Sequence, residues 1–289
     1  MAWLNDVIQG ILLGGLYALF AAGLSLIFGV MRLVNLAHGD LSLLAAYAAL
    51  LIVGPLDINP FLSIFLVVLL VAVFGYILQR GFLNFALEDD PMPTILATFG
   101  LSIVIQNLLL EVFSANSKGL DAGTIETQAL KITDQISIGW FPLITLVTSV
   151  VVLFALQLYL NRTRMGRAFR ATSDNQEAAQ LMGIDNRHLY GLAMAIALGI
   201  VAIAGVFLGI RTTFNPSVGP ARLIFAYEAV IIGGLGSVWG TLVGGMLLGV
   251  AQTIGAHLDP GWGVLAGHLL FLAVLVLRPR GLFAKQVQA

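Results

Sequence analysis

The chain has 289 residues, of which 59% are hydrophobic and 10% charged, and its net charge is −1 at neutral pH. An ordinary soluble domain carries about 25% charged residues, so this composition excludes a water-soluble globule and predicts that much of the apolar surface faces lipid. The small net charge gives no reason to expect nucleic acid as a partner, and the lack of cysteine excludes disulfides and thiolate chemistry.

Apolar segments long enough to cross, or nearly cross, a hydrocarbon layer of about 30 Å recur along the whole chain. They lie at 7–29, 41–53, 61–79, 94–113, 141–160, 189–210, 221–235, 239–256 and 262–277. We predict an all-α, polytopic bundle of about nine transmembrane helices, within a range of about 8–10, several of them short. The intervening polar segments are too short to build a core, so residues 1–289 are expected to form one transmembrane domain.

The connection between the first two apolar segments is a polar stretch that starts at Arg32. Interruptions at membrane depth are tolerated mainly where they are covered by protein or line a cavity. We therefore take Asn35, His38 and Asp40 as candidates for lining the translocation path. The alternatives are that Asp40 caps the next helix and that the backbone satisfies His38.

The segment 163–187 lies between two long apolar segments and is expected to form two short helices. Asp174 precedes Glu177 by three positions, which is capping-box spacing, so a helix is predicted to start at Asn175. Gly183 suits the left-handed residue that ends such a helix.

This second short helix carries small and apolar residues, namely Ala178, Ala179, Leu181 and Met182. It is too short to cross a membrane and too apolar for a solvated tether. It is therefore expected either to dock on another protein or to lie as an amphipathic helix in the membrane interface.

A second break, Arg211 to Pro220, supplies Phe214 and Asn215 as further candidates for the path. Its glycine and prolines are equally what a sharp turn requires. Glu228 lies within the apolar segment 221–235, where an ionised side chain costs on the order of 3 kcal/mol unless it is paired or hydrated. Its expected partner is Arg222 or a polar group of another subunit, and contact with a ligand is the alternative.

Glycines recur four positions apart, a spacing that lets helix backbones approach closely in a bilayer. The pairs are Gly10/Gly14, Gly205/Gly209, Gly240/Gly244 and Gly245/Gly249. We predict that they serve packing within the chain rather than a seam between two chains.

Basic residues predict the orientation, because they are retained on the cytoplasmic side. Ten of the fourteen fall on one predicted side: Arg32, Arg80, Arg162, Arg164, Arg167, Arg170, Arg187, Arg278, Arg280 and Lys285. The C-terminus is then cytoplasmic, and the connections Gly54–Pro60, Asn116–Gly139 and Ala256–Gly263 are outside. The N-terminus is outside as well if there are about nine spans, and a miscounted first span would reverse only that end.

Glu177-Ala178-Ala179 followed by Gly183 resembles the loop by which permeases of ABC importers contact their ATPase subunits. The wider string Gly166–Asp185 is similar to the cytoplasmic loop of the high-affinity branched-chain amino acid permease family. The resemblance continues in Gly14-Gly-Leu-Tyr-Ala-Leu19, Gly23-Leu-Ser-Leu-Ile-Phe-Gly29, Asn35-Leu-Ala-His-Gly-Asp40, Gly233-Gly-Leu-Gly-Ser-Val-Trp-Gly240 and Arg278-Pro-Arg-Gly-Leu-Phe283.

That resemblance implies a bacterial inner-membrane permease that moves branched-chain or related amino acids from a periplasmic binding protein into the cytoplasm. It implies that 163–187 is a cytoplasmic coupling-helix loop for the ATPases. The implied coupling residues are Arg167, Arg170, Asp174, Glu177, Ala178, Ala179 and Gly183. The implied partners are two ATPase subunits, a paralogous permease and the binding protein.

The chain has no Gly-x-x-x-x-Gly-Lys-Ser/Thr phosphate loop, so ATP and Mg are expected to bind to partner ATPases, and this chain is expected to have no cofactor. No catalytic motif is present, and its four histidines lack the spacing of metal ligands, so neither an enzyme nor a metal site is expected. Urea, short amides or another small carboxylate are alternative substrates. An ATP-independent channel or a secondary transporter is an alternative class, and it would leave the docking loop unexplained.

Overall fold

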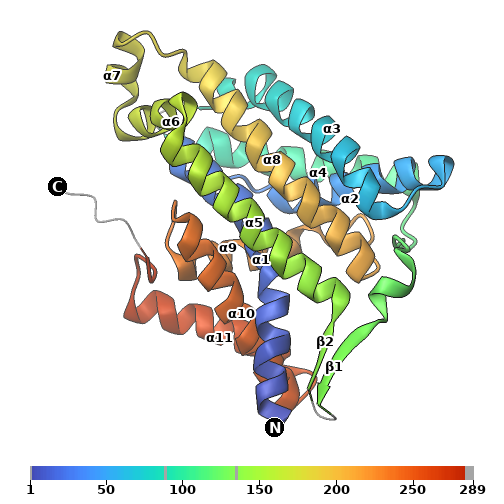
Figure 1. Cartoon of the computed structure of the whole chain (residues 1–289). Helices are drawn as coiled ribbons and strands as arrows, with labels where there is room; N and C mark the ends of the chain where they lie inside the picture. The colour runs from blue at the N-terminus through green and yellow to red at the C-terminus, as the bar shows by residue number, and fades with distance from the viewer. Residues whose placement is uncertain (1, 88–89, 134–135, 284–289) are drawn as a thin grey trace. The chain divides into compact units, whose positions relative to one another are not determined.

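A computed structural model describes residues 2–87, 90–133 and 136–283, and within these ranges the chain is helical apart from short connections and one β-hairpin (Figure 1). The α-helices are α1 (Ala2–Met31), α2 (His38–Leu56), α3 (Pro60–Gly81), α4 (Met92–Phe113), α5 (Trp140–Arg162), α6 (Arg164–Asp174), α7 (Gln176–Leu181), α8 (Asn186–Arg211), α9 (Gly219–Gly233), α10 (Val238–Leu258) and α11 (Trp262–Leu277). Short 3-10 helices lie at Leu83–Phe85 and Gly123–Glu126. The antiparallel hairpin joins β1 (Ala129–Thr133) to β2 (Ile136–Gly139), with Ala129 opposite Gly139.

The predicted all-α membrane bundle is confirmed, because each of the apolar segments coincides with a helix. Seven helices of the described ranges are long and apolar enough to cross a membrane: α1, α2, α3, α4, α5, α8 and α10. The other two apolar helices, α9 and α11, have 15 and 16 residues. At 1.5 Å per residue they measure about 22–24 Å, which is less than the hydrocarbon core of about 30 Å.

The chain divides into two compact units, each assembled from segments that are far apart in the sequence. Unit 1 contains the described residues of Met1–Ser25, Ala122–Phe154 and Ile224–Ala289. Unit 2 contains those of Leu26–Asp121 and Ala155–Leu223. Lys285, one of the basic residues of the tail, lies outside the described residues.

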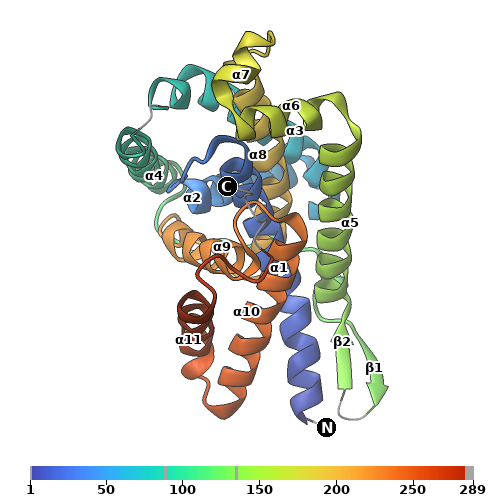
Figure 2. The same cartoon turned by 90° about the vertical axis from the view of Figure 1, so that its left-hand side faces the viewer.

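Unit 1 is held together by glycines that bring helix backbones into direct contact. A Cβ added to Gly14 would lie 2.3 Å from Cα of Met246, and one added to Gly249 would lie 2.2 Å from the carbonyl oxygen of Gly10. The prediction that these glycines pack within the chain is confirmed for the crossing of α1 and α10. Next to α10, α11 returns antiparallel, with Gly255 against Ala266 (Figure 2).

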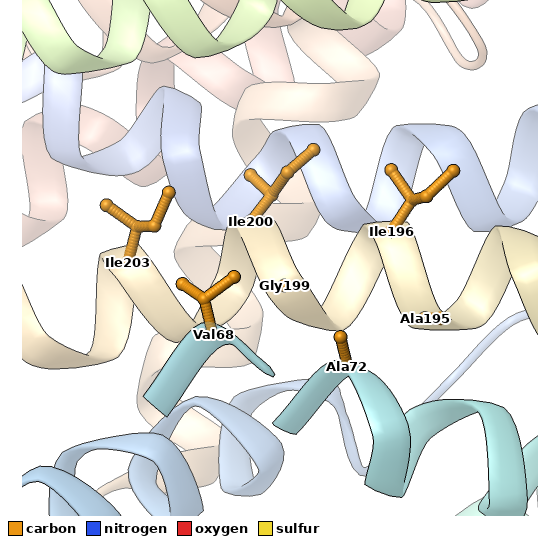
Figure 3. Close-up of a pocket in the computed structure, with 7 residues that line it drawn as sticks. All are labelled: Val68, Ala72, Ala195, Ile196, Gly199, Ile200 and Ile203. Carbon is orange, nitrogen blue, oxygen red and sulfur yellow. The ribbon is translucent and has the colours of Figure 1, made fainter. Parts of the chain in front are cut away.

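In unit 2, α8 packs along α3 and also against α2, where a Cβ on Gly205 would meet the carbonyl oxygen of Ser42 at 2.2 Å. Between α3 and α8 lies a shallow depression (Figure 3). Its lining residues are all apolar: Val68, Ala72, Ala195, Ile196, Gly199, Ile200 and Ile203. A zwitterion needs polar partners when it leaves water, so this depression suits a hydrocarbon chain and not an amino acid.

Candidate functional site

The segment 163–187, called the coupling segment below, forms the two predicted short helices, α6 and α7. Thr163 caps α6 by accepting a hydrogen bond from Gly166 N at 3.0 Å, and Asn175 caps α7 by accepting one from Ala178 N at 2.9 Å. The predicted cap at Asp174 is therefore wrong by one residue. Asp174 still belongs to α6, whereas the extended backbone of Asn175 (φ −150°, ψ 108°) lets its side chain reach the next turn. Gly183 has φ +85°, as predicted for the left-handed residue after α7.

Side-chain hydrogen bonds fasten the coupling segment to two transmembrane helices. Ser173 Oγ donates to the carbonyl oxygen of Gly29 in α1 at 2.7 Å, and Arg32 Nη2 reaches the Ser173 carbonyl at 3.4 Å. On the other side, buried Asn186 at the start of α8 accepts from Thr172 Oγ1 at 3.2 Å and donates to the carbonyl oxygen of Gln176 at 3.0 Å. Both α6 and α7 are thus hydrogen-bonded to the first residue of α8.

The tip of the coupling segment presents apolar side chains on its surface. Leu181 and Met182 are 89% and 84% exposed, the highest values among the exposed large apolar residues of the described chain. Glu177 and Ala178 are exposed beside them, while Ala179 is 4% exposed and packs inward. Among the other candidate coupling residues, Arg167, Asp174 and Gly183 are exposed, and half-buried Arg170 donates to the carbonyl oxygen of Leu160.

Another attachment point joins α3 to the start of α8, and the sequence did not indicate it. Tyr76 Oη lies 2.7 Å from Nδ1 of His188, and Arg80 Nη1 donates to the same hydroxyl at 2.7 Å. Asn84 Nδ2 also donates to the Arg187 carbonyl at 3.3 Å. The end of α3 is therefore tied to the same turn that holds the coupling segment. The one available signal was Arg80 at a helix end. It cannot identify the contact between Tyr76 and His188, which are 112 positions apart.

The first path candidates lie at the start of α2, with Asn35 just before the helix and His38 and Asp40 in its first turn. Asn35, His38 and Asp40 are all buried, with exposures of 0%, 1% and 0%. Asp40 Oδ2 accepts from Ser102 Oγ in α4 at 2.5 Å, and Ser102 in turn accepts from Gln106 Nε2 at 3.0 Å. The alternative that Asp40 caps the helix is wrong, because the N-cap is Ala37 and Asp40 is already the third helical residue.

Phe214 and Asn215 have local structural contacts. Phe214 is 1% exposed, its backbone pairs with Lys118 through two bonds of 2.8 Å, and its ring meets Tyr47 edge-on at a centroid distance of 4.9 Å. Asn215 Oδ1 accepts from Ser217 N at 3.0 Å, which makes an Asx turn before α9. Both residues stabilise the turn that leads into α9.

Glu228 belongs to unit 1, whereas the other path candidates belong to unit 2. It is 3% exposed, and its Oε1 is hydrogen-bonded to His268 Nδ1 of α11. The expectation of a partner from another span holds, and the partner seen in unit 1 is His268. Sequence could not identify it, because His268 is 40 positions away and no spacing rule connects the two residues.

Comparison with known proteins now decides the family. A family model described as branched-chain amino acid transport system / permease component matches residues 7–277. This chain belongs to that family. It is 29% identical to the high-affinity branched-chain amino acid transport system permease protein BraD of Pseudomonas aeruginosa, over 98% of this chain and 96% of that protein. It is 25% identical to LivH, the corresponding permease protein of Salmonella typhimurium, over the same shares of the two chains.

Among solved structures, the chain resembles one from PsaBC of Streptococcus pneumoniae in complex with Fab. The TM-score is 0.49 and the sequence identity 13%, covering 96% of this chain and 93% of that one. Family membership and the seven span-length helices together establish a multi-pass membrane permease subunit.

In this permease, Asn186→Ala is expected to weaken the link between the coupling segment and α8. Two hydrogen bonds are lost and the carbonyl oxygen of Gln176 loses its partner, at a cost of about 1–3 kcal/mol. Uptake of substrate should fall several-fold. Uptake in proteoliposomes measures the effect, with Asn107→Ala as the control, because exposed Asn107 donates to the Ile103 carbonyl oxygen within its own helix α4. Unchanged uptake would show that the link carries no coupling.

Proposed function

We propose that this permease is the translocating subunit of an ATP-driven importer for branched-chain or related amino acids. In this assembly it pairs with a paralogous permease in the bacterial inner membrane. Two ATPase subunits bind on the cytoplasmic side and supply ATP and Mg, and a periplasmic binding protein delivers the substrate. The C-terminus faces the cytoplasm, on the side to which the basic residues point.

The observation that supports this proposal most strongly is the coupling segment itself. It offers an exposed surface of Glu177, Leu181 and Met182, and behind that surface it is fastened to α1 and α8. An exposed apolar pair flanked by a carboxylate is suited to docking in a partner's cleft. Closure of the ATPases would push this segment, and α5 and α8 would move with it to switch access. A channel or a secondary transporter would have no use for such a surface.

The family and its relatives' names support branched-chain amino acids as the substrate, since BraD and LivH are both named for them. Urea, short amides and other small carboxylates are the alternative cargo. The binding protein is expected to select among these, so that the permease needs only a weak contact with the cargo.

The deciding experiment is uptake of labelled leucine into proteoliposomes that contain the permease, its paralogue, the two ATPases and the binding protein. We expect uptake only when ATP and the binding protein are both present, and none when the ATPases are omitted. Uptake of leucine by this chain alone without ATP would show that the protein is a facilitator and not a subunit of an importer. ATP-dependent uptake of urea but not leucine would leave the importer in place with different cargo.

A further inference from the structure

At the start of α2, one polar atom of Asn35, just before the helix, and one of Asp40, in its first turn, are buried without a hydrogen-bond partner in the described part of the chain. They are Nδ2 of Asn35, a donor, and Oδ1 of Asp40, an acceptor. Both side chains are fully buried. Buried polar groups are nearly always paired, because leaving one unpaired destabilises the fold. A donor and an acceptor left unpaired so close together in the chain are therefore the candidates to contact a ligand.

The two atoms are held at the same end of α2. Asn35 Oδ1 accepts from Ala37 N at 3.0 Å, so the amide lies against the helix start, and Nδ2 belongs to that same amide group. Asp40 stands in the first turn, and its other carboxyl oxygen is fixed by Ser102 Oγ at 2.5 Å. The α2 cap makes no side-chain hydrogen bond. A helix N-terminus with a free amide donor favours a carboxylate, and a free carboxylate oxygen favours a cation.

In this structure the turn is closed by direct contact with the start of α9. A Cβ on Gly39 would lie 2.0 Å from the carbonyl oxygen of Gly219, and a Cβ on Gly219 would lie 1.9 Å from Asp40 Oδ1. The two helix starts can come this close because neither Gly39 nor Gly219 has a side chain. Gly219 then covers the unpaired oxygen of Asp40. No ligand fits between them until the two helix starts separate.

We propose that the start of α2, from Asn35 before the helix to Asp40 in its first turn, binds the charged groups of the amino acid in transit, with Asn35 Nδ2 donating to its carboxylate and Asp40 Oδ1 accepting from its ammonium. Separation of Gly39 from Gly219 opens the site, and their contact closes it. This proposal rests on the proposed function and names the polar contacts of its cargo. The carboxylate of a zwitterion is an acceptor group and its ammonium is a donor group. They match the unpaired donor of Asn35 and the unpaired acceptor of Asp40.

The first test is Asp40→Asn, which keeps the shape and an oxygen for Ser102 but removes the negative charge. In the complete reconstituted importer we expect leucine uptake to fall at least tenfold, while ATP hydrolysis stimulated by the binding protein stays within twofold of wild type. The control is Asp57→Asn, an exposed residue at the other end of α2. Wild-type uptake by Asp40→Asn would overturn the site and leave the importer standing. Absence of ATP-dependent uptake by the wild-type complex would instead overturn the proposed function.

A second measurement does not depend on transport by the variant. The chain has no cysteine, so Asp40→Cys introduces a single thiol that a cationic methanethiosulfonate can label in the intact complex in nanodiscs. We expect labelling to be at least tenfold faster after ATP and vanadate trap the complex than without nucleotide. Ala49→Cys, buried in the same helix, should remain unlabelled in both states. Equal labelling rates of Asp40→Cys in the two states would overturn the proposal.

Discussion

Uptake of leucine should fall at least tenfold when Glu177 is replaced by arginine, the largest effect on transport expected from one exposed residue. Glu177 lies in the first turn of α7, next to exposed Leu181 and Met182, and makes no structural contact within the described chain that the substitution would break. Reversing a charge at the centre of a docking surface places like charges opposite each other and typically costs about 2–5 kcal/mol of binding. That loss corresponds to roughly a 30-fold or greater weakening of the contact with the ATPases.

Two measurements test this effect, and monodispersity of the purified variant in detergent shows that it is folded. The first is uptake in proteoliposomes, and the second is the amount of ATPase that copurifies with the tagged permease. Glu111→Arg is the matched control, because Glu111 is equally exposed in the last turn of α4 and lies outside the coupling segment. We expect that variant to retain both uptake and ATPase binding. If Glu177→Arg keeps its ATPases and transports normally, the assignment of α7 as the docking element is wrong.

The largest effect on stability is expected from Gly249→Ala, a change of one methyl group at the crossing of α1 and α10. The added Cβ would lie 2.2 Å from the Gly10 carbonyl oxygen and 2.7 Å from the Gly14 amide nitrogen. Both are backbone atoms and cannot rotate away, so the two helices must separate along a contact built by four glycines. Such overpacking costs about 1–3 kcal/mol, and a backbone clash falls at the upper end.

Gly100→Ala makes the same chemical change where there is room for it. Gly100 lies within α4, and a Cβ there meets nothing within 4 Å. The extra methyl group should stabilise the helix by about 0.5 kcal/mol, since alanine has the lower conformational entropy when unfolded. The fraction of each purified variant that remains monodisperse after heating in detergent compares the two. Equal stability of Gly249→Ala and wild type would show that α1 and α10 do not pack through these glycines.

Much of the architecture was predictable from the sequence, because a bilayer imposes its length and polarity on each helix separately. The apolar segments all proved to be helices, and α6, α7 and the left-handed Gly183 followed from local patterns of charge, size and capping. The glycine spacing likewise predicted close helix crossings, although it did not say which helices cross. The cap of α7 was misplaced by one residue, since Asp and Asn are both good caps and stood side by side at 174–175.

The partners of the buried polar groups were decided only by the tertiary structure. The chain separates these partners by up to 62 positions, and no spacing rule connects them. The three cases are Ser102 with Asp40, His268 with Glu228, and Asn186 with the coupling segment. The same holds for Gly39 and Gly219, whose close contact appears only when α2 and α9 are placed together. Hydropathy determines that a helix is buried in lipid or protein, but a hydrogen bond inside the membrane depends on which helix faces become neighbours. That choice is made by packing of the whole chain.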